Sequence, residues 1–282
     1  MKIDGNQIAQ QILNSLRKEI EKLKERRITP SLAILLVDDD PASKSYVEQK
    51  ELKAKEIGIK TTVFRFSSSV LREDIETEVN KLNNDNSING IVIQRPLPQQ
   101  IDYEFATNVI VKEKDVDGFR KDSRYQPPIA RAVGKILEEI FGKIEQKSSF
   151  LDFLKSKKIT VIGKGETGGK PIIKFLEKQG IKPTVIDTKT ENPEGLVKQS
   201  DILISTVGKP NTVDPKSFKK DVILIPVGMC KDKSGRFHTD YDQTEAERIA
   251  SFYSPVPGGV GPVNVAMLLE NVIESAKTSD SR

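Results

Sequence analysis

The sequence predicts a two-domain α/β protein, with each domain built on a parallel sheet. Amphipathic helical stretches alternate with short apolar strands, and strands joined by helical crossovers run parallel. The alternation falls into two series, separated by a charged segment that ends in two prolines. A length of 282 residues suits two ordinary domains, each large enough to bury a core.

The first series fits a parallel sheet covered by helices. Helical periodicity predicts helices at 8–23, 46–57 and 72–82, and short apolar runs predict strands at 32–37, 62–66 and 90–93. The segment 112–126 is rich in charge and is followed by Pro127 and Pro128, which predicts a junction between domains. The second series has predicted strands at 158–162, 184–186, 201–205 and 222–226, and a final helix at 263–277.

Composition excludes several classes of protein. The chain is 36% hydrophobic and 30% charged, with no apolar run of the ~20 residues that a membrane span needs. The opening MKIDGNQIAQQ does not resemble a signal peptide, so we expect a cytoplasmic protein. One cysteine, Cys230, and one histidine, His238, predict neither a disulfide nor a metal site. The 45 basic residues are interleaved with 41 acidic ones, and this predicts no nucleic-acid partner and no membrane partner.

Tyr46 and Lys50 lie four residues apart in a predicted helix, which places both side chains on one face. Facing a cleft, the ring stacks on a flat heterocycle while the lysine polarises a bond or, once neutral, accepts a proton. On an exposed face, Lys50 is one of many solvated lysines.

A glycine-rich turn opens the second series. ITVIGKGETGGKP follows a strand and precedes a helix that we expect to start near Pro171, and Gly163, Gly165 and Gly168 satisfy the dinucleotide pattern. The alternative is an ordinary tight turn. At the end of the next strand, Asp187 favours NAD through a ribose hydroxyl, whereas Thr188 and Lys189 favour NADP through a 2′-phosphate. The alternative for these residues is a capped turn with a solvated lysine.

Three further stretches carry candidate ligand groups. Gln94 ends an apolar strand just before Arg95 and Pro96, at the edge where open α/β sheets bind ligands. SPVPGGVGP leads directly into an apolar helix and leaves free backbone amides. KDVDGF places Asp115 and Asp117 on one side of an extended chain, where a carboxylate either binds an aminopyrimidine or terminates a turn.

In this order, YVEQK, GIVIQRPLPQQID, KDVDGF, GKGETGGKP, DILISTVGKP and PVPGGVGPVNVAMLLEN resemble the bifunctional methylenetetrahydrofolate dehydrogenase/methenyltetrahydrofolate cyclohydrolase family, from about Gly5 to Ala276. The resemblance implies a folate-binding catalytic domain at 1–120 plus 263–282 and a Rossmann-type NAD(P)-binding domain at 121–262. The last helix would return to the first domain. The implied activity is oxidation of 5,10-methylenetetrahydrofolate with NADP, or alternatively NAD, followed by hydrolysis to 10-formyltetrahydrofolate. Tetrahydrofolate derivatives are the implied partners, and the implied assembly is a homodimer.

The same resemblance assigns roles to residues. Lys50 is the implied catalytic lysine, Gln94 tunes it, Asp117 holds the pterin and Tyr46 stacks on the folate. Other implied substrate-binding residues are Arg95, Pro96, Pro257, Gly258, Gly259, Gly261 and Pro262. The implied cofactor-binding residues are Gly163, Lys164, Gly165, Thr188, Lys189 and Met229.

Several positions depart from the family pattern, mostly on the cofactor side. Gly165 replaces a usual serine, Gly168 a valine, Arg120 a histidine and Pro226 an aspartate, and residues 127–130 replace a Pro-Cys-Thr-Pro stretch. We expect Arg120 or Lys164 to compensate. The departures keep two alternatives open, a cyclohydrolase without useful dehydrogenase activity and a non-catalytic folate- or nucleotide-binding protein. A shikimate-type or amino-acid dehydrogenase would need its own acid/base pair, which the first series does not show.

Overall fold

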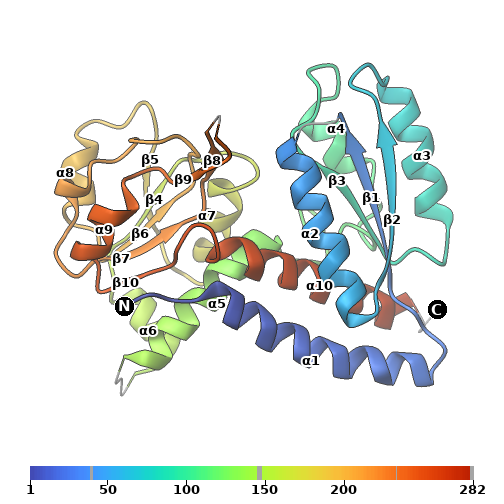
Figure 1. Cartoon of the computed structure of the whole chain (residues 1–282), viewed down its shortest axis with the longest axis horizontal. Coiled ribbons are helices and arrows are strands. Elements are labelled where there is room, and N and C mark those ends of the chain that lie inside the picture. Colours follow the sequence, from blue (N-terminus) through green and yellow to red (C-terminus); the bar gives the residue numbers. More distant parts are fainter. Residues whose placement is uncertain (39–40, 145–147, 233, 280–282) are drawn as a thin grey trace. The chain divides into compact units, whose positions relative to one another are not determined.

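The computed structural model describes residues 1–38, 41–144, 148–232 and 234–279, and the chain forms two compact units (Figure 1). Unit 1 comprises Met1–Ala9 and Ile129–Asn264, and unit 2 comprises Gln10–Pro128 and Val265–Arg282. Each unit is therefore assembled from segments that are far apart in the sequence.

Unit 2 contains a parallel sheet with strand order β2-β1-β3. Its strands are β1 (Ser31–Val37), β2 (Lys60–Phe66) and β3 (Gly90–Gln94). Its helices are α2 (Pro41–Ile57), α3 (Arg72–Asn84), α4 (Tyr103–Asn108), and most of α1 (Gly5–Glu25) and α10 (Val260–Ser279). Every residue of the central strand β1 is buried, because both faces of the sheet are covered. Ala33, Leu35 and Val37, on one face of β1, share a core with α3 and α4.

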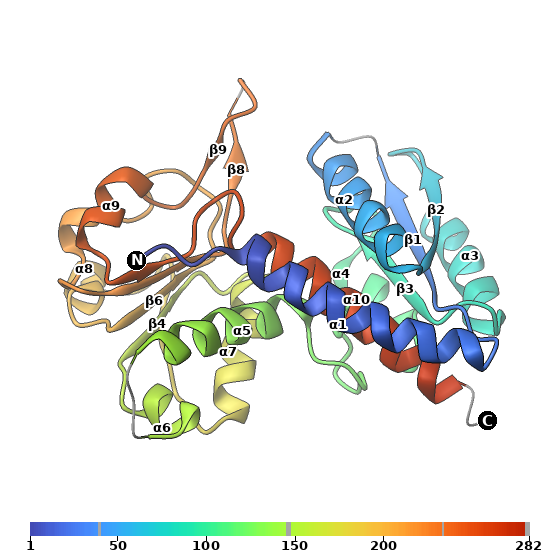
Figure 2. The ribbon, with the colours of Figure 1, turned by 60° about the horizontal axis from the view of Figure 1, so that its bottom comes forward.

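The last helix belongs mainly to unit 2. Within this unit α10 runs beside α1 (Figures 1 and 2), and Lys277 pairs with Glu19 across the two helices. Two buried polar side chains of α10 fix its position. Asn271 Nδ2 donates to the backbone oxygens of Val116 (2.8 Å) and Gln126 (3.0 Å). Ser275 Oγ donates to the backbone oxygen of Asn89 at 2.6 Å.

Unit 1 contains a parallel sheet with strand order β10-β7-β6-β4-β5. Its strands are β4 (Ile159–Ile162), β5 (Thr184–Ile186), β6 (Ile202–Ser205), β7 (Ile223–Pro226) and β10 (Phe252–Tyr253), and a hairpin is formed by β8 (Cys230–Lys231) and β9 (Phe237–His238). Its helices are α5 (Pro128–Lys143), α6 (Phe150–Lys155), α7 (Gly169–Lys178), α8 (Pro193–Val197), η1 (Pro215–Ser217) and α9 (Gln243–Ile249). The amino-terminal residues extend this sheet, since Ile3 N donates to Tyr253 O at 2.8 Å.

The strands and helices that the sequence predicts lie within five residues of their predicted bounds, but the sixteen-residue helix α5 was not predicted. Two local details differ from the prediction. α7 begins at Gly169 rather than near Pro171. Pro128, at the end of the predicted junction, is also the first residue of helix α5. Proline has no backbone N–H, but the N–H groups of the first helical turn have no partner within the helix, so nothing is lost there. The apolar face of α5 is fully buried, including Val133, Ile136 and Ile140.

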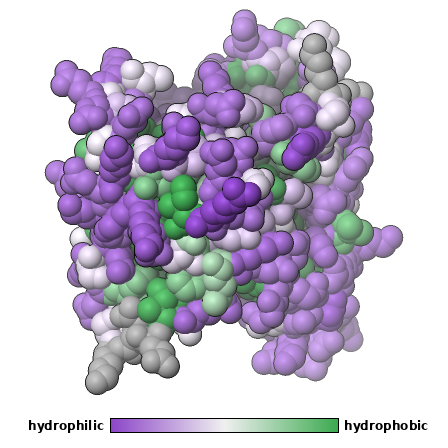
Figure 3. Space-filling view, turned by 60° about the vertical axis from the view of Figure 1, so that its left-hand side comes forward, coloured by the Kyte–Doolittle hydropathy of each residue, from purple (hydrophilic) through white to green (hydrophobic). Residues whose placement is uncertain are grey.

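The surface agrees with the charged composition. The face drawn in Figure 3 carries mostly hydrophilic side chains, with small apolar patches between them. Within the described ranges, no helix combines the length and the apolar character that crossing a membrane requires.

Candidate functional site

A buried lysine and a buried amide form the centre of the site in unit 2. α2 carries Lys50 and the end of β3 carries Gln94, and Lys50 Nζ lies 2.9 Å from Gln94 Oε1. Lys50 is 8% exposed, which is rare for a lysine, and Gln94 is 9% exposed. The solvated-lysine interpretation of Lys50 is therefore wrong, because the helix turns this side chain toward the sheet.

Burial has a direct electrostatic effect on Lys50. Removing the ammonium from water lowers its pKa, and the negative charge of Asp117 opposes this by raising the pKa. The net shift is downward, so more of the amine is neutral near pH 7 than in an exposed lysine. A neutral amine accepts a proton, which is what a general base does.

Tyr46 lies one helical turn before Lys50 on α2. The ring is 40% exposed, which is high for a large aromatic side chain. An exposed aromatic ring beside a buried amine matches the platform predicted for a flat heterocycle.

Asp117 lies in a tight turn whose shape depends on Gly118. Gly118 has φ +69°, and a Cβ there would meet backbone atoms of the 125–127 segment at 2.7–2.8 Å. Asp115 is buried behind this turn and accepts a hydrogen bond from Arg120 N at 3.0 Å. Asp115 thus supports the turn from within, whereas Asp117 is half-buried and its charge acts on Lys50. Arg120, predicted to compensate on the cofactor side, instead donates to Asp122 and to backbone oxygens of unit 2.

The buried Asp115 gives a pH-dependent stability that can be measured. Burial raises the pKa of Asp115 to about 6, against an ordinary value of 3.8, so the folded state binds the extra proton between these values. The contribution of Asp115 to the free energy of unfolding is therefore most favourable below pH 4, and it is lost as the pH rises through 6. We expect the unfolding free energy of the wild type, relative to Asp115→Asn, to fall by about 2 kcal/mol from pH 4 to pH 7. Urea unfolding of both proteins at several pH values measures it, and a difference that does not change with pH would contradict it.

The other two predicted substrate residues of unit 2 follow Gln94 directly. Pro96 is exposed, and its bond to Arg95 is cis. The Arg95 guanidinium lies 3.4 Å from the centre of the Tyr103 ring, and its Nη2 is 3.1 Å from Thr107 Oγ1. This side chain is thus engaged by α4.

The predicted glycine turn of unit 1 connects β4 to α7. Gly163 has φ +90°, and a Cβ on Gly169 would lie 2.0 Å from Gly163 O, so both positions require glycine. Gly165 is different, since a Cβ there meets nothing within 4 Å. The turn brings backbone close to the amino terminus of α7, where Lys170 N donates to Gly165 O at 3.1 Å and Pro171 has no N–H.

The residues expected to select the cofactor ribose lie at the end of β5. Asp187 forms an ion pair with Lys164 and accepts from Lys189 N (2.9 Å). The Lys164 ammonium and these hydrogen bonds lower the pKa of Asp187 to about 2. Thr188 and Lys189 are exposed, and Met229 is half-buried after β7. Asp187 is therefore ionised and already bonded, as in the capped-turn alternative, while the side chains of Lys164 and Lys189 stay on the surface.

The loop before α10 holds the remaining predicted residues, all of them in unit 1. Gly258 has φ +96° and packs against Asn6, and a Cβ on Gly259 would lie 2.4 Å from Pro255 O. Gly261 has open space around it, and the Val256–Pro257 bond is cis. Pro262 lies in the first turn of α10, where its missing N–H costs nothing. Lys50, Gln94, Asp117, Tyr46, Arg95 and Pro96 lie in unit 2, and the loop and turn residues lie in unit 1.

Sequence reasoning missed Asp240, a fully buried carboxylate of unit 1. It accepts hydrogen bonds from three successive amides, Val207 N (3.0 Å), Gly208 N (2.6 Å) and Lys209 N (2.9 Å). Burial raises the pKa of Asp240, and these bonds oppose the shift. Asp240 thereby holds the loop that follows β6. Nothing in HTDYD distinguishes it locally, because its partners lie about thirty residues earlier.

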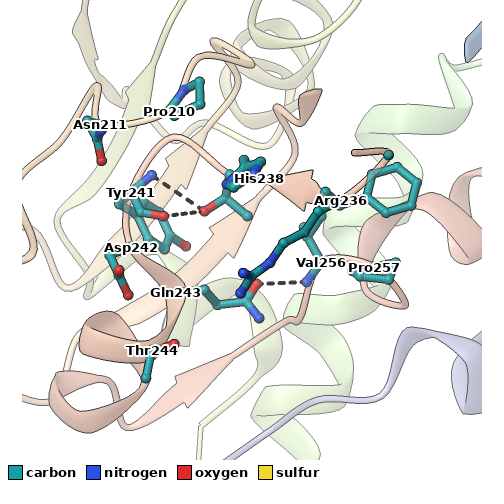
Figure 4. Close-up of a pocket in the computed structure, with 13 residues that line it drawn as sticks. Pro210, Asn211, Arg236, His238, Tyr241, Asp242, Gln243, Thr244, Val256 and Pro257 are labelled. Carbon is teal, nitrogen blue, oxygen red and sulfur yellow. Dashed lines mark hydrogen bonds between the residues drawn. The ribbon is translucent and has the colours of Figure 1, made fainter. Parts of the chain in front are cut away.

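A polar cavity of about 560 Å³ in unit 1 was also not predicted (Figure 4). Arg236 and His238 of the β8–β9 hairpin and Gln243 at the start of α9 line it. Gln243 Oε1 accepts from Val256 N at 2.9 Å, and this bond joins the cavity wall to the loop before α10. The His238 ring bonds to Asp232 at 2.8 Å.

A strand–glycine turn–helix unit in one half of the chain and a buried lysine–amide pair in the other define a two-domain α/β enzyme that binds a dinucleotide. Family models give the same result. Residues 3–117 match the catalytic domain of tetrahydrofolate dehydrogenase/cyclohydrolase, and residues 143–280 match its NAD(P)-binding domain. The chain belongs to the tetrahydrofolate dehydrogenase/cyclohydrolase family, which confirms the predicted family and enzyme class.

Individual relatives agree. The bifunctional protein FolD of a Bacillus cereus strain is 37% identical over 284 residues, covering 98% of this chain and 96% of that protein. The crystal structure of the Campylobacter jejuni bifunctional enzyme FolD is 32% identical, with a TM-score of 0.90 and 99% coverage of both chains. The FolD of Trypanosoma brucei, solved with NADP cofactor and inhibitor, is 29% identical with a TM-score of 0.90, over 100% of this chain and 99% of that one. The predicted fold class is confirmed.

A more distant likeness bears on one alternative. Shikimate dehydrogenase from Aquifex aeolicus is 13% identical, with a TM-score of 0.50 over 90% of this chain and 98% of that one. It shares the two-domain fold alone.

Proposed function

We propose that this protein oxidises 5,10-methylenetetrahydrofolate to 5,10-methenyltetrahydrofolate with NADP and hydrolyses the methenyl product to 10-formyltetrahydrofolate. The observation that carries the proposal is the Lys50–Gln94 pair. A buried amine with a depressed pKa, held by an amide acceptor, suits the hydrolytic step, which consumes a water and releases a proton.

In hydrolysis, Lys50 in its neutral form accepts a proton as the oxygen of water bonds to the methenyl carbon. The bond from this carbon to N5 then breaks, N5 takes the proton back from the Lys50 ammonium, and the hydroxyl proton is released to water, which leaves the formyl group on N10. Gln94 Oε1 fixes the direction of the amine, so its lone pair is held in one orientation. Asp117 binds the aminopyrimidine part of the pterin through its carboxylate, and Tyr46 stacks on the planar part of the substrate. Gly258 and Gly259, with Pro257, Gly261 and Pro262, bind the substrate through their backbone. Arg95 and Pro96 shape the chain that follows Gln94.

The chain fits a nicotinamide dinucleotide. The positive φ of Gly163 and the close packing of Gly169 on Gly163 O give a tight turn of bare backbone before α7, and Gly165 faces open space in this turn. A nicotinamide held there would supply the acceptor for the hydride that leaves the methylene carbon. Gly163, Lys164 and Gly165 would hold the pyrophosphate, Thr188 and Lys189 would hold the ribose, and Met229 would contact the nicotinamide. No acid is needed for this step, because the two nitrogens that flank the carbon stabilise the product cation.

Folate binding with catalysis and cofactor binding are assigned to different units. Unit 2 corresponds to the folate-binding catalytic domain and unit 1 to the NAD(P)-binding domain, with residues 1–9 packed on the latter. The enzyme acts as a homodimer in the cytoplasm, as the resemblance implies. Sedimentation of the purified protein tests the dimer, and a single species of about 32 kDa would argue against it.

The assay that tests the proposal follows absorbance. Purified protein is mixed with 5,10-methylenetetrahydrofolate and NADP or NAD, and the decay of added methenyltetrahydrofolate is followed separately. Cofactor reduction together with methenyl decay supports both activities. Methenyl decay without reduction of either cofactor would leave only the cyclohydrolase, and the absence of both signals would overturn the proposal.

Lys164 gives a prediction about cofactor choice. Lys164→Gln removes a cation next to the ribose site and leaves the carboxylate of Asp187 without its ion pair. That carboxylate repels a 2′-phosphate but can accept a hydrogen bond from a 2′-hydroxyl. We expect the Kd for NADP to rise about tenfold while the Kd for NAD stays level or falls. Fluorescence titration with both cofactors measures it, with Lys182→Gln as the matched exposed control. An equal change for both cofactors would contradict this role.

A further inference from the structure

The orientation of the Gln94 amide follows from its two neighbours. A lysine side chain only donates hydrogen bonds, and a backbone carbonyl only accepts them. Gln94 Oε1 faces Lys50 Nζ at 2.9 Å, and Gln94 Nε2 faces Arg95 O at 2.8 Å. If the amide rotated by half a turn, its Nε2 donor would face the Lys50 donor. Its Oε1 acceptor would then face the Arg95 carbonyl, which is also an acceptor. The carbonyl of Arg95 is therefore what keeps the acceptor of Gln94 directed at Lys50.

The position of that carbonyl is fixed by the Arg95 side chain. Its guanidinium lies 3.4 Å from the centre of the Tyr103 ring and 5.3 Å from that of Phe119, and it bonds to the buried hydroxyl of Thr107. Ser43 Oγ of α2 also reaches Arg95 O, at 3.4 Å. Cation–π contacts of this kind are strongest when the cation is partly desolvated, and Arg95, Tyr103 and Phe119 are all half-buried.

The same contacts join the two parts of the substrate site in unit 2. Phe119 lies two residues after Asp117, and its ring also meets that of Tyr103 edge-on at 6.1 Å. Arg95 thus connects the strand end that carries Gln94 with the turn that carries Asp117.

We propose that Arg95 is a positioning residue, whose side chain, anchored on Tyr103 and Thr107, fixes the carbonyl that directs Gln94 toward Lys50. It acts through Gln94 and does not contact the folate. This inference rests on the proposed function.

The test is methenyltetrahydrofolate hydrolysis by full-length Arg95→Met, with kcat and KM measured across pH. We expect kcat to fall about tenfold with KM nearly unchanged, because a catalytic group is misplaced while the binding groups remain. The pH inflection of Lys50 should move to lower pH, because a weaker acceptor stabilises the ammonium less, while Asp117 still acts on it. A rise in KM, with kcat and the pH inflection of Lys50 both unchanged, would show that Arg95 contacts the substrate. That result would overturn the inference.

Three comparisons make the result specific. In a Gln94→Ala background, Arg95→Met should lower kcat no further, and additive losses would contradict action through Gln94. Arg95→Lys keeps a cation over the ring and should lose less than Arg95→Met, and the reverse order would argue against the stacking. Arg72→Met is the matched control, because Arg72 also contacts α4, lying 4.2 Å over the Phe105 ring and 3.9 Å from Asp102, but is not adjacent to Gln94 in the chain. A loss of kcat there equal to that of Arg95→Met would contradict the specific role. Absence of hydrolysis in the wild type would instead refute the proposed function itself.

Discussion

Replacing Lys50 by Met should lower the rate of methenyltetrahydrofolate hydrolysis by about 10²- to 10⁴-fold, the range that a general base contributes. Methionine matches the length of the lysine stem but has no amine to accept a proton. Because Lys50 is 8% exposed, the variant also avoids burying a charge, so the fold should be at least as stable as the wild type. Stopped-flow absorbance measures the rate, and thermal unfolding checks the fold.

The matched control for this change is Lys55→Met, on the same helix but exposed. It removes one positive charge from α2 without touching Gln94. Its hydrolysis rate should equal that of the wild type. Turnover by Lys50→Met at the wild-type rate would refute the assignment of Lys50 as the base.

Gly169→Ala should remove NADP-dependent oxidation. The new Cβ would lie 2.0 Å from Gly163 O and 2.7 Å from Gly163 C, and both are backbone atoms that cannot rotate away. The turn must open, which displaces the glycine backbone from the pyrophosphate, and a displacement of about 1 Å costs roughly 10²-fold in rate. The Kd for NADP should rise in parallel, and the midpoint of thermal unfolding should fall because overpacking costs about 1–3 kcal/mol.

Gly142→Ala, in helix α5 of the same unit, provides the control. Nothing lies within 4 Å of the added carbon, and Gly142 is exposed and outside the cofactor turn, so NADP binding should equal that of the wild type and stability should not fall. Methenyl hydrolysis separates loss of the cofactor turn from general unfolding, since Lys50 and Gln94 lie in the other unit and should still act in Gly169→Ala. An unchanged Kd for NADP in Gly169→Ala would contradict the cofactor site.

Much of the fold could be predicted because its main elements have strong local signals. Strand β1 is a continuous apolar run, and α1 and α3 have helical periodicity, so their positions follow from the sequence. The helix spacing and the strand end also brought Lys50 and Gln94 forward as candidates. What the sequence does not state is that they meet, because burial of Lys50 depends on packing between α2 and β3.

The features that were missed depend on distant contacts. The pairing of Ile3 with Tyr253 joins residues 250 positions apart, and no local pattern in the first residues predicts it. The β8–β9 hairpin and β10 are two residues per strand, too short for periodicity to detect. Arg95 was predicted from its place after Gln94, but its stacking on Tyr103 depends on how the chain returns through α4.

The docking of α10 has a consequence for synthesis of the protein. Asn271 and Ser275 satisfy backbone oxygens at Val116, Gln126 and Asn89, yet all of residues 129–259 are made between those partners and the helix. During translation, the surface of unit 2 that α10 covers therefore stays exposed until residues 129–259 have been made. Lys50 is made early, but the unit that holds it is completed by one of the last helices to emerge.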